Sequence, residues 1–131
     1  MMKNKQITIF FSIIIILVFG AIITFLSHKD ADKTVAGRYD SFAVCLKDKG
    51  AVFYGAFWCS HCNNQKILFG SSKDLLPYVE CSTPDASGQT QICKDKKIEG
   101  YPTWEFADGS RLTGEVPFET LAQKTSCVLP L

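Results

Sequence analysis

Residues 51–62 have the sequence AVFYGAFWCSHC, in which an uninterrupted apolar run leads directly into two cysteines separated by two residues. The run from Ala51 to Trp58 is typical of a central strand that is buried on both faces of a sheet. The residues from Ser60 to Phe69 have the pattern of a helix, which we expect to end at Gly70. The cysteine pair therefore lies where a buried strand passes into the N-terminus of a helix.

The position of Cys59 and Cys62 predicts thiol–disulfide exchange. Unpaired N–H groups and the helix dipole favour an anion at a helix N-terminus, and thiol pKa values in such pairs fall from about 8.5 to between about 3.5 and 7.5. We expect Cys59 to be the exposed nucleophile and Cys62, one turn further along, to be the buried resolving thiol. His61, when protonated, would stabilise the thiolate and make the oxidised pair a stronger oxidant.

A zinc site is the alternative interpretation of such a cysteine pair. It requires a second close pair of ligands, whereas Cys81 and Cys93 are far apart in the sequence. We therefore expect no metal and no cofactor.

The segments around the cysteine pair alternate between helix and strand. Helices between strands indicate an α/β fold, with a mixed sheet flanked by helices on both faces. The sequence Asp108-Gly109 between two apolar runs predicts a hairpin. The predicted helices are 38–49, 60–69, 91–97 and 118–127, and the predicted strands are 51–58, 76–82, 103–106 and 111–113.

The N-terminal part of the chain predicts a membrane anchor. After a short tail, residues 1–6, the segment 7–26 contains no charged residue. Twenty apolar residues match a hydrocarbon core of roughly 30 Å, and a cleaved signal, the alternative, would have a shorter apolar region followed by small residues. The polar segment 27–37 is predicted to be a flexible linker, and residues 38–131 form the globular domain.

Charge and cysteine content indicate the compartment. The net charge of +1 and the absence of a basic stripe argue against a nucleic-acid partner. Six cysteines in a small domain behind an export segment indicate disulfide chemistry outside the cytosol. We expect a single-pass protein of the cell (inner) membrane, with a cytoplasmic N-terminus and a periplasmic or extracellular domain.

A second motif, Gly100-Tyr101-Pro102-Thr103-Trp104, follows about forty residues later. Proline just before a strand marks either a strand start or a cis bond. Together with Phe57-Trp58-Cys59-x-x-Cys62, this motif resembles the thioredoxin superfamily over residues 38–127. The stretches 49–62, 78–81 and 100–104 resemble in particular the thioredoxin-like domain associated with bacterial homologues of vitamin K epoxide reductase.

The resemblance implies roles for residues and partners. Pro102 would be a cis-proline whose loop docks the substrate, and His61, Trp58 and Tyr101 would support the catalytic pair. The domain would carry electrons from the cysteines of secreted proteins to a membrane quinone reductase of the vitamin K epoxide reductase type. The bilayer would be a further partner through the anchor.

Two features depart from the family pattern. Ser60-His61 stands where family members often have Pro-His, and Phe53 occupies the position where thioredoxins carry a buried acid. The proton acceptor for Cys62 must then be another group. Glu80 on the neighbouring strand is one candidate, and the alternative is that Glu80 simply faces solvent.

The other four cysteines are predicted to form structural disulfides. Cys81 and Cys93, a pair also found in the resembling domain, bracket a polar loop, and joining them would contribute roughly 3 kcal/mol. Cys45 on the first helix and Cys127 on the last are left as a further pair, with free thiols as the alternative. A relay function is the alternative role for either bridge.

Three classes of function are compatible with this sequence. The first is an oxidant or electron carrier for disulfide formation, and the second is a membrane-tethered disulfide reductase or isomerase. The third is a redox-inert thioredoxin-like binding module. The residues do not fix the direction of electron flow, because about 30 mV of potential corresponds to only 1.4 kcal/mol.

Overall fold

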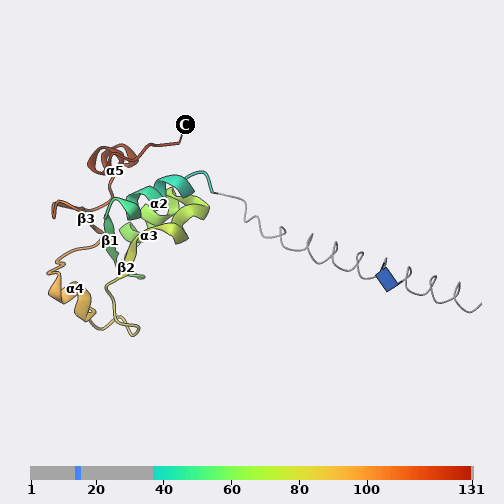
Figure 1. Ribbon diagram of the computed structural model, residues 1–131. Helices are drawn as coiled ribbons and strands as arrows, with labels where there is room; N and C mark the ends of the chain where they lie inside the picture. The colour runs from blue at the N-terminus through green and yellow to red at the C-terminus, as the bar shows by residue number, and fades with distance from the viewer. Residues whose placement is uncertain (1–13, 16–36, 131) are drawn as a thin grey trace, which may run out of the picture. The chain divides into compact units, whose positions relative to one another are not determined.

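The computed structural model describes residues 14–15 and 37–130 (Figure 1). The predicted tail, anchor and linker lie outside the described residues, apart from Ile14, Ile15 and Gly37. Within these two described ranges, no helix is both long enough and apolar enough to cross a membrane. The chain divides into two compact units, 1–35 and 36–131, and the second unit contains the predicted domain.

The order of helices and strands matches the predicted alternation of elements (Figure 1). The sheet has four strands in the order β2-β1-β3-β4, with β1 and β2 parallel and the other two pairs antiparallel. The predicted mixed sheet is confirmed. The elements are α2 (Asp40–Asp48), β1 (Val52–Gly55), α3 (Ser60–Leu68), the 3-10 helix η2 (Gly70–Leu75), β2 (Tyr78–Glu80), α4 (Gln91–Asp95), β3 (Thr103–Glu105), β4 (Arg111–Thr113) and α5 (Phe118–Thr125).

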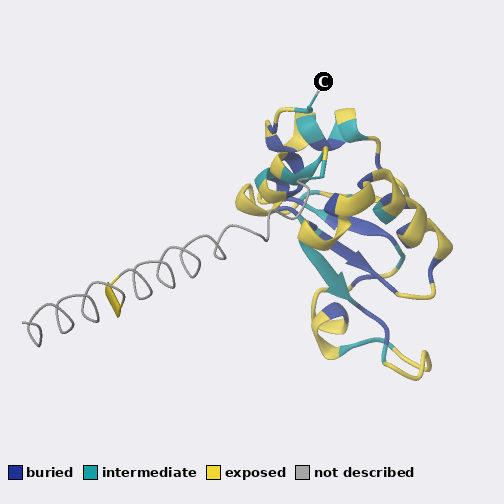
Figure 2. Ribbon diagram, turned by 90° about the vertical axis from the view of Figure 1, so that its right-hand side faces the viewer, coloured by how far each residue is buried: buried dark blue, intermediate teal, exposed yellow. Residues whose placement is uncertain are grey.

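The two faces of the sheet are covered unequally. Successive residues of a strand point to opposite faces, so Phe53 and Tyr54 of β1 belong to different cores. Phe53 stacks on Trp104 of β3 at 4.7 Å between ring centroids, and this larger core is closed by residues of α2, α3 and α5. Tyr54 packs with Cys93 of α4 and with Ile98 on the opposite face. In Figure 2 much of β1 and β3 is coloured as buried, whereas the surrounding helices carry many exposed residues.

The predicted strand 51–58 is too long. Gly55 is the last paired residue of β1, opposite Glu80, and the N–H of Cys59 then donates to the carbonyl of Ala56 at 3.0 Å to form a turn. Phe57 and Trp58 are 47 % and 54 % exposed. The apolar run therefore joins a buried strand to a surface turn, because apolar character alone does not reveal which residues are covered.

The helix predicted at 60–69 is confirmed, and α3 ends at Leu68, just before Gly70. Gly70, with a positive φ of 57°, begins the separate 3-10 helix η2, which the sequence pattern does not predict because its mostly polar residues carry no helical periodicity. The bounds of β4 match the prediction, and the elements other than β1 differ from it by at most two residues at each end, as expected for boundaries read from a pattern. The hairpin is confirmed, with Gly109 at φ 76° and the N–H of Ser110 donating to Asp108 Oδ1 at 2.9 Å.

Candidate active site

Cys59 is the N-cap residue of α3. The backbone N–H of Cys62 donates to Cys59 Sγ at 3.4 Å, and the Cys59 thiol faces the carbonyl of Tyr101 at 3.7 Å. The first turn of α3 thus directs a backbone donor at this sulfur. Cys59 is 8 % exposed, so the nucleophile is less accessible than predicted.

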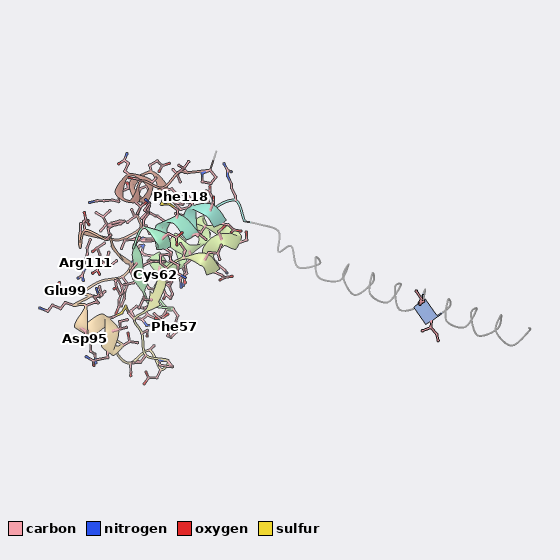
Figure 3. The ribbon with its side chains drawn as sticks, in the orientation of Figure 1. Phe57, Cys62, Asp95, Glu99, Arg111 and Phe118 are labelled. Atoms are coloured by element: carbon pink, nitrogen blue, oxygen red, sulfur yellow. A yellow bond between two sulfur atoms is a disulfide. The ribbon has the colours of Figure 1, made fainter. Side chains whose placement is uncertain are left out.

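Cys62 is fully buried on the inner side of α3. Burial, followed by a hydrogen bond with Cys59, raises the pKa of the Cys62 thiol to about 12. Figure 3 shows Cys62 near the centre of the domain and Phe57 nearer its edge. At neutral pH Cys62 is therefore a thiol, and it must lose its proton before it can attack a disulfide.

The loop that contains Pro102 lies beside Cys59. The Tyr101–Pro102 peptide bond is cis, and the Tyr101 carbonyl faces the sulfur of Cys59. Trp58 packs edge-to-face with Tyr101 at 6.0 Å, and its indole N–H donates to Ser82 Oγ at 2.8 Å. The structure thus brings Trp58, Tyr101 and Pro102 together at the first cysteine, whereas their functional roles remain predictions.

His61 contacts Glu115, a residue that the sequence did not identify as part of the site. Its Nδ1 lies 2.7 Å from Glu115 Oε1, and Asn64 donates to the same carboxylate oxygen at 3.1 Å. The hydrogen bond from His61, and next that from Asn64, lowers the pKa of Glu115. Glu115 is a single acid in a loop, 54 residues away in the chain, so no local pattern identifies it.

Buried Gln65 fixes the same loop against α3. Its side-chain amide donates to the carbonyl of Val116 at 3.1 Å and accepts from the Val116 N–H at 2.6 Å. Both hydrogen-bond partners of this buried amide are backbone groups of Val116, so the two bonds specify a single position for the loop. Sequence reasoning missed Gln65, because glutamine in a helix usually faces solvent.

Glu80 is half-buried rather than solvent-facing. One carboxylate oxygen accepts from the N–H groups of Phe57 and Ser82, at 3.2 and 2.9 Å, and the other accepts from Tyr78 Oη at 2.7 Å. Charge-assisted hydrogen bonds of this kind are stronger than neutral ones. Glu80 therefore holds the turn that leads into Cys59 against the end of β2.

The remaining cysteines are joined in two disulfides. Cys45 of α2 is bonded to Cys127, which follows α5, with 5.9 Å between Cα atoms. Cys81 after β2 is bonded to Cys93 of α4, with 5.5 Å between Cα atoms, and Cys59 and Cys62 are free. In the part of the chain that the structure describes, no group of three or more His, Cys, Asp or Glu side chains is arranged to hold a metal ion.

Replacing both Cys81 and Cys93 with serine should destabilise the domain without stopping thiol exchange. Loss of a loop closure of about 13 residues corresponds to roughly 3 kcal/mol. Thermal unfolding and glutathione exchange, both measured on the double variant, check this expectation. An unchanged melting temperature with complete loss of electron transfer would make this pair a relay instead of a structural bridge.

The comparisons with known proteins agree with this geometry. No family model matches the chain. The chain is 46 % identical over 89 residues to the thiol-disulfide oxidoreductase LTO1 of Arabidopsis thaliana, a match that covers 65 % of this chain and 23 % of that protein. The chain thus spans less than a quarter of that relative. The match, the mixed sheet and the free cysteine pair support a thioredoxin-like oxidoreductase.

Proposed function

We propose that this protein is an extracytoplasmic thiol–disulfide oxidoreductase that carries electrons from cysteines of secreted proteins to a membrane quinone reductase of the vitamin K epoxide reductase type. One observation carries the proposal: of six cysteines, only Cys59 and Cys62 are free, and they lie at the N-terminus of α3 beside the cis-proline loop. This arrangement suits a pair that cycles between dithiol and disulfide.

Two features support the extracytoplasmic setting. The two disulfides within one small domain are typical of an oxidising compartment, where such bonds persist. The uncharged apolar segment 7–26 is long enough to anchor the domain at the membrane. A location in the cell (inner) membrane, with the domain on the outer side, is compatible with both features.

The proposal is tested with the reduced full-length protein in vesicles that contain a quinone and a quinone reductase of this type. We expect reoxidation of the Cys59–Cys62 pair to be coupled to quinone reduction, and the oxidised protein to oxidise an unfolded, cysteine-containing substrate. The Cys59→Ser variant is the matched control and should do neither. A protein that reduces or rearranges substrate disulfides, and that the quinone reductase does not reoxidise, would instead be a reductase or isomerase.

The tether should affect encounter rates more than chemistry. The predicted linker, residues 27–37, would reach roughly 18 Å as a coil of eleven residues, and confinement near a partner gives effective concentrations that can reach about the millimolar range. A protein that begins at Ala31 should therefore keep its glutathione exchange rate but lose most of its reoxidation by the membrane enzyme.

Both rates are measured for the full-length and shortened proteins in the same vesicles. Equal losses of the two rates, or a mature N-terminus located after Gly20, would show that the apolar segment is an export signal and not a functional anchor.

A further inference from the structure

Phe53 occupies the position where thioredoxins carry a buried acid. Among the described residues, a cation, and not an acid, lies in the surroundings of Cys62. Lys66 lies one turn after Cys62 on α3, and residues four apart share one face of a helix. The Lys66 ammonium lies over the ring of Tyr78, with Nζ 3.3 Å from the ring centroid. A cation held over an aromatic face at this distance has a defined position.

Tyr78 and Cys62 meet over Gly55. A Cβ atom built on Gly55 would lie 2.8 Å from the Tyr78 ring and 3.0 Å from Cys62 Sγ, so both groups occupy the space that a side chain would fill. Gly55 is therefore required for this close approach. The ring that carries the Lys66 ammonium is thus also a neighbour of the Cys62 sulfur.

The charges around this cluster single out Lys66 as the stabilising cation. No carboxylate forms an ion pair with Lys66 among residues 37–130. Five other titratable groups interact with Cys62 or Lys66. They are Cys59 at the N-cap of α3, Tyr78 and Glu80 on β2, and Lys73 and Asp74 on η2. Burial is the main cause that raises the pKa of Cys62, and the positive charge of Lys66 counteracts part of this rise. Burial likewise lowers the pKa of Lys66, and the negative charges of Glu80 and then Cys62 counteract part of that decrease.

The other side of Lys66 borders a pocket. This pocket has a volume of about 530 Å³ and is lined by Asn63, Lys66, Lys73, Asp74, Leu76 and Tyr78. Cys62 itself has no exposed surface. The pocket therefore exposes Lys66 and Tyr78 to solvent, whereas Cys62 is not among its lining residues.

We propose that Lys66 is a positioning residue whose ammonium group, seated on the Tyr78 ring, stabilises the Cys62 thiolate while Cys62 resolves the mixed disulfide. The inference rests on the proposed function, because it concerns one step of that exchange. Cys62 gives up the proton that the departing substrate thiolate finally takes up, and the Cys62 thiolate attacks Cys59 Sγ. The Cys59–Cys62 disulfide forms as the bond between Cys59 and the substrate breaks, and the substrate leaves as a thiolate that takes up a proton.

The test uses the reduced full-length protein and dithionitrobenzoate, a small disulfide whose coloured thiol is released in two phases. The first phase is attack by Cys59, and the second is resolution by Cys62. Removing the charge in Lys66→Met should raise by about one unit the pH at which the second phase reaches a given rate. The second phase should then be about tenfold slower at neutral pH, while the first phase changes little.

Two matched variants separate charge from structure. Lys66→Arg keeps the charge and should restore most of the second-phase rate. Lys73→Met removes another positive charge that lines the same pocket and should leave the pH dependence of the second phase unchanged. Thermal unfolding of each variant reports on the fold independently.

The proposal is overturned if Lys66→Met has the pH profile of the unmodified protein, if Lys66→Arg behaves like Lys66→Met, or if Lys73→Met shifts that profile equally. These outcomes are independent of the proposed physiological function. A protein that shows the expected second phase but is not reoxidised in quinone vesicles keeps the role of Lys66 and loses the proposed electron acceptor.

Discussion

Replacing Cys62 with alanine is expected to leave covalent complexes between Cys59 and its substrates that the protein cannot resolve. Of the free pair, Cys59 at the N-cap of α3 keeps 8 % of its surface exposed, whereas Cys62 has no exposed surface and is predicted to release the substrate. Without Cys62 the attack still takes place, but turnover should fall to the level of uncatalysed exchange. Non-reducing electrophoresis after alkylation should show mixed disulfides that dithiothreitol removes.

The Cys59→Ala variant is the matched control, and it should form no complexes. If that variant accumulates complexes while Cys62→Ala does not, the roles of the two cysteines are reversed. The unmodified protein offers a second check. Because burial raises the pKa of Cys62 to about 12, the thiolate fraction, and with it the rate of resolution, should rise about tenfold per pH unit below that value.

The parts of the fold that could be predicted from the sequence are those with a local cause. The hairpin follows from Asp108-Gly109, since Gly109 adopts a positive φ of 76° that glycine tolerates. The start of α3 at Ser60 is predicted from the cysteine pair that follows the apolar run, although a turn separates this pair from the end of β1 at Gly55. In both cases neighbouring residues determine the backbone, so a short window of sequence is sufficient.

The parts that could not be predicted depend on residues that are distant in the chain. His61 meets Glu115 and Gln65 meets Val116 only because the loop before α5 folds back onto α3. The exposure of Trp58 is a similar case, because apolar character predicts burial unless the fold places a residue at a functional surface. Such pairings depend on the tertiary fold, which composition and periodicity do not specify.

Replacing both Cys45 and Cys127 with serine should have the largest effect on stability of any change considered. The bridge has a sequence separation of 82 and ties α2 to the end of the domain. Closing a loop of this length corresponds to about 4.5 kcal/mol in the chain-entropy model, against roughly 3 kcal/mol for the shorter bridge. For a domain of this size each kcal/mol lowers the melting temperature by about 4–8 °C. We therefore expect a decrease on the order of 20 °C.

The fold itself should survive at low temperature, because α2 and α5 are also joined by aromatic packing. The ring centroids of Phe42 and Phe118 lie 5.6 Å apart, and Phe118 packs on Phe69 at 4.6 Å. Thiol exchange measured well below the transition should consequently remain near that of the unmodified protein. The Cys81/Cys93 double serine variant is the matched comparison. If it loses more stability than the Cys45/Cys127 variant, loop length is not what determines the contribution of these bridges, and local strain or packing around α4 must account for the difference.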